Sequence, residues 1–282
     1  MKLCRYGKAG HEKPGVIDGE GRLRDLSKLI ANIGPNEISP RSLKMLTRQK
    51  TDSLPLVNSS PRLGVPYVGI GKFVAIGLNY SDHAKEAGLP IPAEPIVFMK
   101  ATTCINGPND DIVQPKHSTK LDWEIELGVV MGSPAKYVSE AEALNYVAGY
   151  CIVNDVSERA FQMATTQWDK GKGFDTAGPI GPWLVTADEV RDPQTLDMAL
   201  EVNGRRMQSG NTRTMVFSVA KIISHVSHYM TLLPGDIIAT GTPPGVGLGM
   251  KPDPVFLKPG DVMHLTIAGL GEQRQKVVPY AG

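Results

Sequence analysis

The sequence predicts a β-rich α+β fold. Stretches with strand character outnumber helical patterns, and they do not alternate with helices in the regular way that builds a doubly wound parallel sheet. Asn203-Gly204, between "ALEV" and "RRM", is a strong hairpin signal because both residues tolerate the positive φ of a type I′ turn. At least part of the sheet is therefore expected to be antiparallel.

Composition and charge favour a globular protein that acts on a small molecule. The chain has 282 residues, a formal net charge of +1, 41% hydrophobic residues and 21% charged residues. This length can form one large core and a smaller domain. Without runs of Lys or Arg, or a basic amphipathic helix, neither nucleic acid nor a membrane surface is an expected partner. The start "MKLCRYGKAG" has no signal-peptide core, so a cytoplasmic location is expected.

Residues 1–65 are predicted to form a small α+β domain. It contains the strand-like pieces "KLCRY" and "GVIDGEGRLRDLS", then a polar helix near Ser42 to Arg48. The following stretch "TDSLPLVNSSPRLGVP" is rich in Pro, Ser and Asn, which favours a connector. The boundary is placed close to Val65, and residues 66–282 form the second domain.

Strands dominate the second domain. The predicted strands lie in "GKFVAIGLNY", "PIVFMK", "LDWEIELGVVMG", "YVAGYCIVNDVS", "PWLVT", "DMALEVNGRRM", "GDIIATG" and "DVMHLTIAG". Pro234-Gly235 and Pro259-Gly260 each precede such a stretch and suit a type II turn. Ser139 and Glu142 form a capping-box pattern that predicts a short helix through Asn145. Apolar side chains from Val219 to Met230 share one face of a second helix, which is expected to pack on the sheet.

The stretch "LDWEIELGVV" places three acidic residues on one face of a strand. Residues Asp122, Glu124 and Glu126 alternate with apolar residues, and neighbouring side chains on one face lie about 7 Å apart. Two such carboxylates repel by roughly 2 kcal/mol at an effective dielectric near 20, so a cation is expected to neutralise them. A hard divalent ion such as Mg²⁺ or Mn²⁺ prefers such oxygen ligands. The alternative, charges exposed on an edge strand, stays open.

A third ligand is predicted from "GYCIVNDVSERAFQ". This segment runs as an apolar strand into Asp155 and then into a helix expected to begin near Ser157. Helical spacing places Arg159 and Gln162 on one face with Asp155, and the guanidinium of Arg159 could bind an anionic substrate in bidentate fashion. The alternative is that Asp155 is an ordinary helix N-terminal residue and Arg159 a surface charge.

A possible acid–base pair lies in "NYSDHAKEAG". Ser81 or Asp82 can cap a short helix that Gly88 ends, and His83 and Glu86 then share one face. A carboxylate can hold a histidine in the tautomer that a general base needs, although such a pair is also common on protein surfaces.

Two glycine-rich segments could approach a ligand. "WDKGKGFDTAGPIGP" carries Lys170 and Lys172 in a segment expected to be irregular, and "ATGTPPGVGLG" places Thr242 after a strand. The "GVGLG" run lacks the helix that a dinucleotide-binding fingerprint requires. His225 and His228 are interpreted as packed or surface residues, because no other ligand pattern supports a metal site there.

Six ordered motifs resemble the fumarylacetoacetate hydrolase family over roughly residues 70 to 280. They are "GLNYSDHAKEAG", "PIVFMK", "DWEIELGVVMG", "NDVSERAFQ", "GKGFDTAGPIGPW" and "GTPPGVG". The resemblance implies a mixed β-roll catalytic domain and a homodimer. It assigns Mg²⁺ or Mn²⁺ binding to Glu124, Glu126 and Asp155, with Asp122 as a residue that supports these ligands. It makes His83 and Glu86 a catalytic dyad on a lid, and matches Arg159, Gln162, Lys172 and Thr242 to positions near the substrate.

The resemblance also implies a reaction. A 2,4-diketo acid would chelate the metal, His83 oriented by Glu86 would take a proton from water, and a carbon–carbon bond would break to leave a pyruvate enolate, with Lys172 near the developing charge. The expected substrates are 2,4-diketo-3-deoxy-rhamnonate or -fuconate, giving pyruvate and lactate, or an acylpyruvate. Alternatives are an oxaloacetate decarboxylase, a hydratase, an isomerase or a ureidoglycolate lyase-like enzyme, and, in another class, a noncatalytic metal-dependent binder of keto acids.

Overall fold

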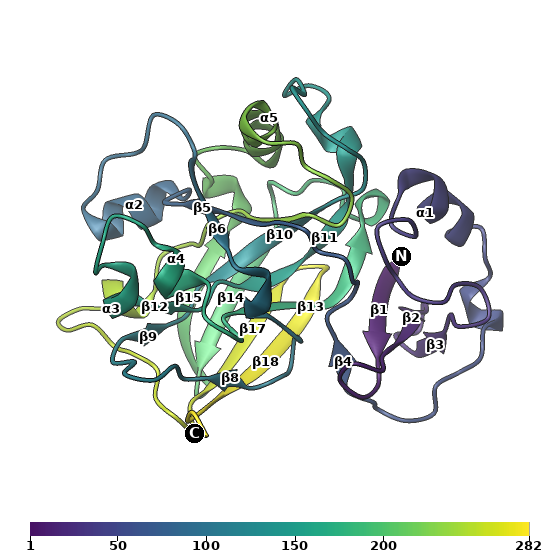
Figure 1. Cartoon of the computed structure of the whole chain (residues 1–282), viewed down its shortest axis with the longest axis horizontal. Coiled ribbons are helices and arrows are strands. Elements are labelled where there is room, and N and C mark those ends of the chain that lie inside the picture. The colour runs from purple at the N-terminus through teal and green to yellow at the C-terminus, as the bar shows by residue number, and fades with distance from the viewer. Residues whose placement is uncertain (282) are drawn as a thin grey trace.

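A computed structural model describes residues 1–281 of the chain. The fold combines a large mixed sheet, a smaller mixed sheet and a two-stranded ribbon, with short helices at their margins (Figure 1). The β-rich α+β class predicted from the sequence is confirmed. The N-terminal region, drawn in purple, lies at one side of the larger body (Figure 1).

The largest sheet has the strand order β3-β2-β1-β13-β11-β10-β16-β5-β6, and β4 and β7 pair with β1 and β13 beside this path. Its strands are β1 (Lys2–Tyr6), β2 (Lys13–Ile17), β3 (Leu23–Asp25), β4 (Leu63–Gly64), β5 (Phe73–Gly77), β6 (Ile96–Lys100), β7 (Ile105–Asn106), β10 (Ile125–Met131), β11 (Val147–Asn154), β13 (Gly178–Thr186) and β16 (Ile237–Ala239). Neighbours along the path are antiparallel except β16 and β5, and β7 also runs parallel to β13.

The smaller sheet has the order β15-β14-β17-β18-β8. Its strands are β8 (Ile112–Val113), β14 (Asp197–Val202), β15 (Arg205–Asn211), β17 (Val262–Ile267) and β18 (Gly271–Val278). The ribbon pairs β9 (Leu121–Asp122) with β12 (Ser157–Glu158). As predicted, β14 and β15 form a tight hairpin in which Asn203 and Gly204 have φ values of 52° and 78°.

Helices are short and lie around the sheets. The α-helices are α1 (Pro40–Leu46), α2 (Ser81–Ala87), α3 (Arg159–Gln162), α4 (Asp169–Lys172) and α5 (Val219–Tyr229). The 3-10 helices are η1 (Thr51–Ser53), η2 (Thr102–Cys104), η3 (Ala143–Tyr146), η4 (Ala187–Glu189), η5 (Thr212–Thr214) and η6 (Gly247–Gly249). Helix α5 buries the apolar face predicted for it, including Ile222, Ile223 and Val226.

Two predicted helices differ in the structure. The Ser139 hydroxyl does donate to Glu142 at 2.8 Å, but the segment forms a turn followed by η3 instead of an α-helix through Asn145. The helix expected near Ser157 begins at Arg159, because Ser157 and Glu158 pair with β9 as strand β12. At Ser157 the local helical pattern competes with strand pairing, and the pairing determines the conformation.

Strand β18 was not predicted, and neither were the two-residue strands β4, β7 and β8. The inward positions of β18 include Gln273 and Gln275, both completely buried, in place of the apolar residues that mark an ordinary half-buried strand. Their amides are satisfied by other buried groups, so the strand packs without an apolar pattern.

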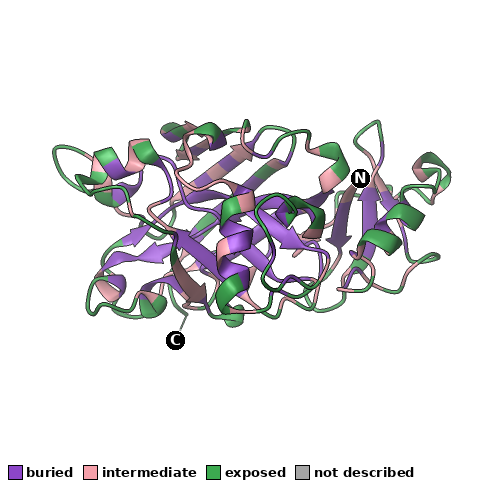
Figure 2. Cartoon of the chain, turned by 90° about the horizontal axis from the view of Figure 1, so that it is seen from above, coloured by how far each residue is buried: buried purple, intermediate pink, exposed green. Residues whose placement is uncertain are grey.

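The hydrophobic core lies where the sheets face one another, and exposed residues gather in the peripheral loops and helix faces (Figure 2). This core is continuous with that of the N-terminal region, since Leu3, Val16 and Leu26 belong to the same buried cluster as Phe73 and Ile125. Within residues 1–281, no helix combines the length and the apolar character needed to cross a bilayer.

Candidate active site

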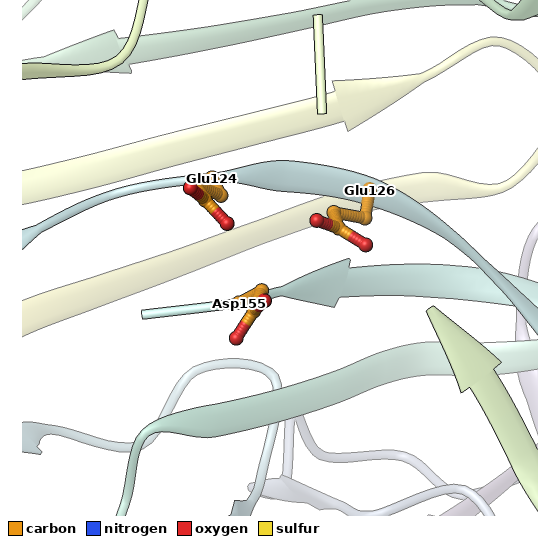
Figure 3. A group of neighbouring side chains, drawn as sticks. All are labelled: Glu124, Glu126 and Asp155. Atoms are coloured by element: carbon orange, nitrogen blue, oxygen red, sulfur yellow. The ribbon is translucent and has the colours of Figure 1, made fainter. Parts of the chain in front are cut away.

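Three buried acidic side chains meet at one point in the larger sheet. Glu124 lies in the short gap between β9 and β10, Glu126 lies in β10, and Asp155 follows the last residue of β11. One carboxylate oxygen from each lies within 4.8 Å of the other two. Figure 3 shows the two glutamates on one segment, turned toward Asp155 on its neighbour. The exposed-edge alternative is excluded, because no more than 6% of any of the three residues is exposed.

Two buried lysines neutralise part of this charge. Lys172 Nζ lies 2.5 Å from Glu124 Oε2 and 2.7 Å from Asp155 Oδ2, so it bridges two of the three acids. Lys100 Nζ lies 2.6 Å from the other oxygen of Asp155 and donates to the carbonyl of Lys172. Burial alone would lower the pKa of Lys172, but Asp155 and Glu124 outweigh it and raise that pKa, so Lys172 is an ammonium ion.

Arg159 links Glu124 to a fourth acid, Asp122. Its Nε donates to Asp122 at 2.8 Å, one terminal nitrogen to Glu124 at 2.7 Å and the other to Gln162 Oε1 at 3.0 Å. These bonds use three of the five N–H groups of the guanidinium and leave two for a ligand. Asp122 therefore orients the Arg159 guanidinium beside the cluster, which is consistent with the supporting role expected for Asp122.

The charges in this cluster do not balance. Four buried carboxylates, including Asp122, face three cations, and Glu126 is the acid for which the described residues supply no ion pair. Burial, together with the charges of Asp155 and Glu124, raises the pKa of Glu126 well above its ordinary value. Burial alone would also raise the pKa of Glu124, but Lys172 and Arg159 outweigh it and lower that pKa to about 2. An oxygen-only donor set with one uncompensated buried charge fits a hard divalent cation.

The glycine-rich loop after β16, residues 240–249, supplies backbone N–H groups to the acids. Gly241 donates to Glu126 at 2.8 Å, and Gly247 and Leu248 donate to Asp122 at 2.6 Å and 3.0 Å. Glycine was expected there because it lets backbone approach a ligand. The structure shows instead that the loop backbone approaches the protein's own carboxylates.

The His83–Glu86 pair forms on α2 and faces the same cavity. His83 Nδ1 lies 2.9 Å from Glu86 Oε2, while the other oxygen of Glu86 accepts a hydrogen bond from Gly245 N at 2.9 Å. With Glu86 ionised, Nδ1 carries the proton and donates it, which leaves Nε2 as a proton acceptor. The same loop that holds the acidic cluster thus also holds the dyad.

These groups line one cavity of about 440 Å³. Its lining contains all nine residues predicted for the site: His83, Glu86, Glu124, Glu126, Asp155, Arg159, Gln162, Lys172 and Thr242. The cavity also has an apolar wall, which includes Ile76, Leu78, Ile96, Phe98, Trp168, Val246 and Leu248. The structure brings the predicted residues together, while their individual roles remain predictions.

Several site details differ from the sequence prediction or were missed by it. Lys172 lies in a short helix, α4, instead of an irregular segment. Thr242 is buried and its hydroxyl donates to Ile125 O at 2.8 Å, so that proton is not available to a substrate. Lys100 had no predicted role; the only signal was a cation at the end of the otherwise apolar strand "PIVFMK". His225 and His228 lie on α5, outside this cavity.

Comparison with known proteins agrees with this geometry. Residues 72–278 match the family described as "Fumarylacetoacetate (FAA) hydrolase C-terminal". A relative from Burkholderia multivorans is 60% identical over 276 residues, which is 98% of each chain, and its name gives a provisional assignment as a hydrolase without a substrate.

Solved structures of enzymes with several activities share the fold. A fumarylacetoacetate hydrolase from Exiguobacterium antarcticum is 35% identical with a TM-score of 0.89 over 99% of both chains. Maleylpyruvate hydrolase from Sphingobium, solved with manganese(II) and pyruvate, is 30% identical with a TM-score of 0.83 over 99% of both chains. A 2-hydroxyhepta-2,4-diene-1,7-dioate isomerase from Mycobacterium marinum is 33% identical with a TM-score of 0.76 over 100% of both chains. The chain therefore belongs to the fumarylacetoacetate hydrolase family of enzymes.

Proposed function

We propose that this enzyme is a divalent-metal-dependent hydrolase that cleaves a carbon–carbon bond in a 2,4-diketo acid, releasing pyruvate and a carboxylic acid. One observation carries the proposal: a buried three-carboxylate cluster and an ordered His83–Glu86 pair line the same cavity. A noncatalytic binder would not need an acid–base pair beside its ligand.

Glu124, Glu126 and Asp155 are the residues that would hold the cation, either Mg²⁺ or Mn²⁺. When bound, such an ion supplies a Lewis acid that polarises substrate oxygens and stabilises negative charge on them. Manganese(II) and pyruvate in the related maleylpyruvate hydrolase support both this choice of ion and pyruvate as a product. The remaining N–H groups of Arg159 and the Nε2 amide group of Gln162 are suited to the carboxylate of the substrate.

His83 acts as the general base. Its Nε2 takes a proton from water while the water oxygen forms a bond to C4 of the diketo acid. The C3–C4 bond then breaks, and its electron pair leaves with the pyruvate part as an enolate. His83 returns the proton to C3, so the products are pyruvate and the carboxylic acid derived from C4 and its substituent. Lys172, which forms ion pairs with Glu124 and Asp155, acts as the ammonium ion that stabilises the enolate charge.

The apolar wall favours an acylpyruvate over a diketo sugar acid. A sugar-acid chain carries hydroxyl groups, which would need hydrogen-bond partners once they are removed from water. The apolar wall offers side chains such as Phe98, Trp168 and Leu248, which match an alkyl or aryl substituent instead.

A substrate panel tests this proposal. We expect Mg²⁺- or Mn²⁺-dependent loss of ultraviolet absorbance with acylpyruvates, faster as the acyl group grows from acetyl to a larger apolar group, and pyruvate that a coupled dehydrogenase can detect. A higher kcat/KM for a diketo sugar acid than for any acylpyruvate would contradict the preference for an apolar acyl group. Turnover at the wild-type rate after complete metal removal would overturn metal dependence.

Substitution of the base provides a second test. His83→Ala should lower kcat by about 10²- to 10⁴-fold, the usual contribution of a general base, because no group remains to accept the proton of water. Its affinity for Mn²⁺ should match that of the wild-type enzyme, since His83 is not among the acidic ligands. An unchanged kcat would remove the dyad from the mechanism.

Isomerisation of a 2-hydroxydienoate diacid is the second candidate. Lys251, an exposed cation at the mouth of the cavity, could bind the distal carboxylate of such a substrate, and the related Mycobacterium marinum enzyme is an isomerase of this class. Incubation of the enzyme with a diacid in ²H₂O, followed by NMR, distinguishes the two reactions, because isomerisation gives one product and hydrolysis gives two.

A further inference from the structure

The segment that carries the two glutamates is not one continuous strand, because regular strand structure is interrupted between β9 and β10. Trp123 and Glu124 belong to neither strand, and they are buried together with Ile125, the first residue of β10. Buried N–H groups in such a gap need partners from outside an ordinary strand ladder. Two side-chain amides supply them: Asn154 Oδ1 accepts from Glu124 N at 3.2 Å, and Gln208 Oε1 accepts from Ile125 N at 3.0 Å.

Gln208 reaches this gap from the other sheet. It lies in β15, is completely buried, and has no counterpart among the predicted site residues. Its Nε2 donates to Thr242 Oγ1 and to Pro243 O, both at 2.8 Å. Because Pro243 O can only accept, the NH₂ group must face that loop, and the amide oxygen must therefore face Ile125.

Gln208 and Thr242 together hold both backbone polar groups of Ile125. Gln208 accepts from its N–H, and the Thr242 hydroxyl, oriented by the bond it accepts from Gln208, donates to its carbonyl at 2.8 Å. Ile125 lies between Glu124 and Glu126 in the sequence. Fixing the two peptide groups on either side of Ile125 therefore fixes where both glutamate side chains leave the backbone, and with them the spacing of the carboxylates.

We propose that Gln208 is a positioning residue for the metal ligands: it acts through Ile125, in concert with Thr242, to set the geometry of Glu124 and Glu126. This inference rests on the proposed metal dependence of the enzyme. A buried glutamine that served only to fill the core would be replaceable by an apolar residue of equal size without any effect on the cation.

Mn²⁺ affinity, measured by electron paramagnetic resonance on the full-length protein, tests the proposal. Gln208→Met keeps the volume and removes the three hydrogen bonds, and it should weaken Mn²⁺ binding by about 10-fold or more, as loss of residues that orient metal ligands does. The matched control is Gln273→Met. Gln273 is also completely buried in the smaller sheet, but it bonds no residue of the gap: its amide donates to Ile152 O and Gly181 O, and its oxygen is linked to Glu124 only through Gln275 and Asn154. The control should lose thermal stability but keep the wild-type Mn²⁺ affinity.

The outcomes separate the inference from the proposed function. Unchanged Mn²⁺ affinity in Gln208→Met, or an equal loss in Gln273→Met, overturns the positioning role alone. Absence of Mn²⁺ binding in the wild-type protein overturns both. If Gln208→Met does not fold, the pair Thr242→Ser and Thr242→Val tests the other hydrogen bond that holds the Ile125 backbone. Only serine keeps the hydroxyl that donates to Ile125 O. Weaker Mn²⁺ binding in Thr242→Val, with wild-type affinity in Thr242→Ser, supports the proposal, and equal affinities overturn it.

Discussion

At the residue scale, two glutamates separated by one residue have opposite protonation behaviour. Glu124 contacts both Lys172 and Arg159, whereas within residues 1–281 the Glu126 carboxylate has only the backbone N–H of Gly241 as a hydrogen-bond partner. Their pKa values therefore move apart, down for Glu124 and up for Glu126, although both are buried. Neighbouring charges, and not burial alone, decide the direction.

This difference predicts a pH-dependent stability of the metal-free protein. The folded-state pKa of Glu126 is raised above its ordinary value of 4.5, so the stability contributed by its neutral form is present below 4.5 and lost as the pH rises through the raised pKa. Glu126→Gln is neutral at every pH. In chelator, its melting temperature should exceed that of the wild type at high pH by at least about 2 °C.

Thermal denaturation in EDTA at several pH values measures this effect, and Mn²⁺ titration of the same samples provides the control. The wild type should bind Mn²⁺ more tightly as the pH rises, because the ion displaces the proton of Glu126, and Glu126→Gln should bind it weakly at all pH values. Parallel stability curves for the two proteins would contradict the assignment of Glu126 as the uncompensated acid.

At the element scale, the loop after β16 is the part that joins the acidic cluster to the dyad. Its N–H groups reach Glu126, Glu86 and Asp122 in succession along residues 241–248. Glycine is required where this backbone passes close to other groups. A Cβ on Gly247 would lie 2.0 Å from Val255 O and 2.7 Å from Asp122 Oδ1.

Gly247→Ala should therefore displace the loop. We expect a loss of stability of about 1–3 kcal/mol, the usual cost of overpacking, and a lower kcat, because Asp122 and through it Arg159 lose their orientation. Gly19→Ala is the control, since a Cβ there meets no atom within 4 Å and the backbone has no positive φ. Chemical denaturation and acylpyruvate turnover measure the two effects. Equal behaviour of both variants would contradict the role assigned to the loop.

At the scale of the whole molecule, the predicted boundary near residue 65 is crossed by a sheet and by ion pairs. Strand β1 pairs with β13 through Lys2 and Leu3, and Arg62 bonds both Glu12 and Asp110. The division into residues 1–65 and 66–282 stays a prediction. These contacts indicate that the N-terminal region supports the catalytic part physically.

Removal of residues 1–65 should therefore destabilise the rest of the chain. The truncation would expose the edge of β13 and the apolar residues now buried against Leu3 and Val16. We expect residues 66–282 to aggregate or to melt at least about 5 °C below the full chain, measured by size-exclusion chromatography and thermal denaturation. A monodisperse fragment with the melting temperature of the full chain would show an independent domain.

The homodimer implied by the family resemblance also stays a prediction at this scale. Sedimentation equilibrium of the full chain should give twice the chain mass of 30.4 kDa. A mass of one chain at all concentrations would contradict it.

The sequence alone determined the fold class and predicted a set of site residues that share one cavity. Stretches with strand character located most of the longer strands, Asn203-Gly204 predicted the hairpin, and six motifs identified nine residues that the structure brings to one cavity. These signals come from neighbouring residues or from family resemblance, so they can be recognised without knowing the tertiary structure. The same local reasoning misplaced the helix start at Ser157, because pairing with β9 outweighed the local pattern.

Tertiary structure alone decided how the charges balance and what holds the acids in place. Lys100 lies 55 residues from Asp155 in the sequence, Gln208 lies 83 residues from Ile125, and Gly241 lies 115 residues from Glu126. No sequence period links such distant positions. Long-range packing places them in contact, and the low dielectric of the interior then makes each contact strong enough to set a pKa or fix a side chain.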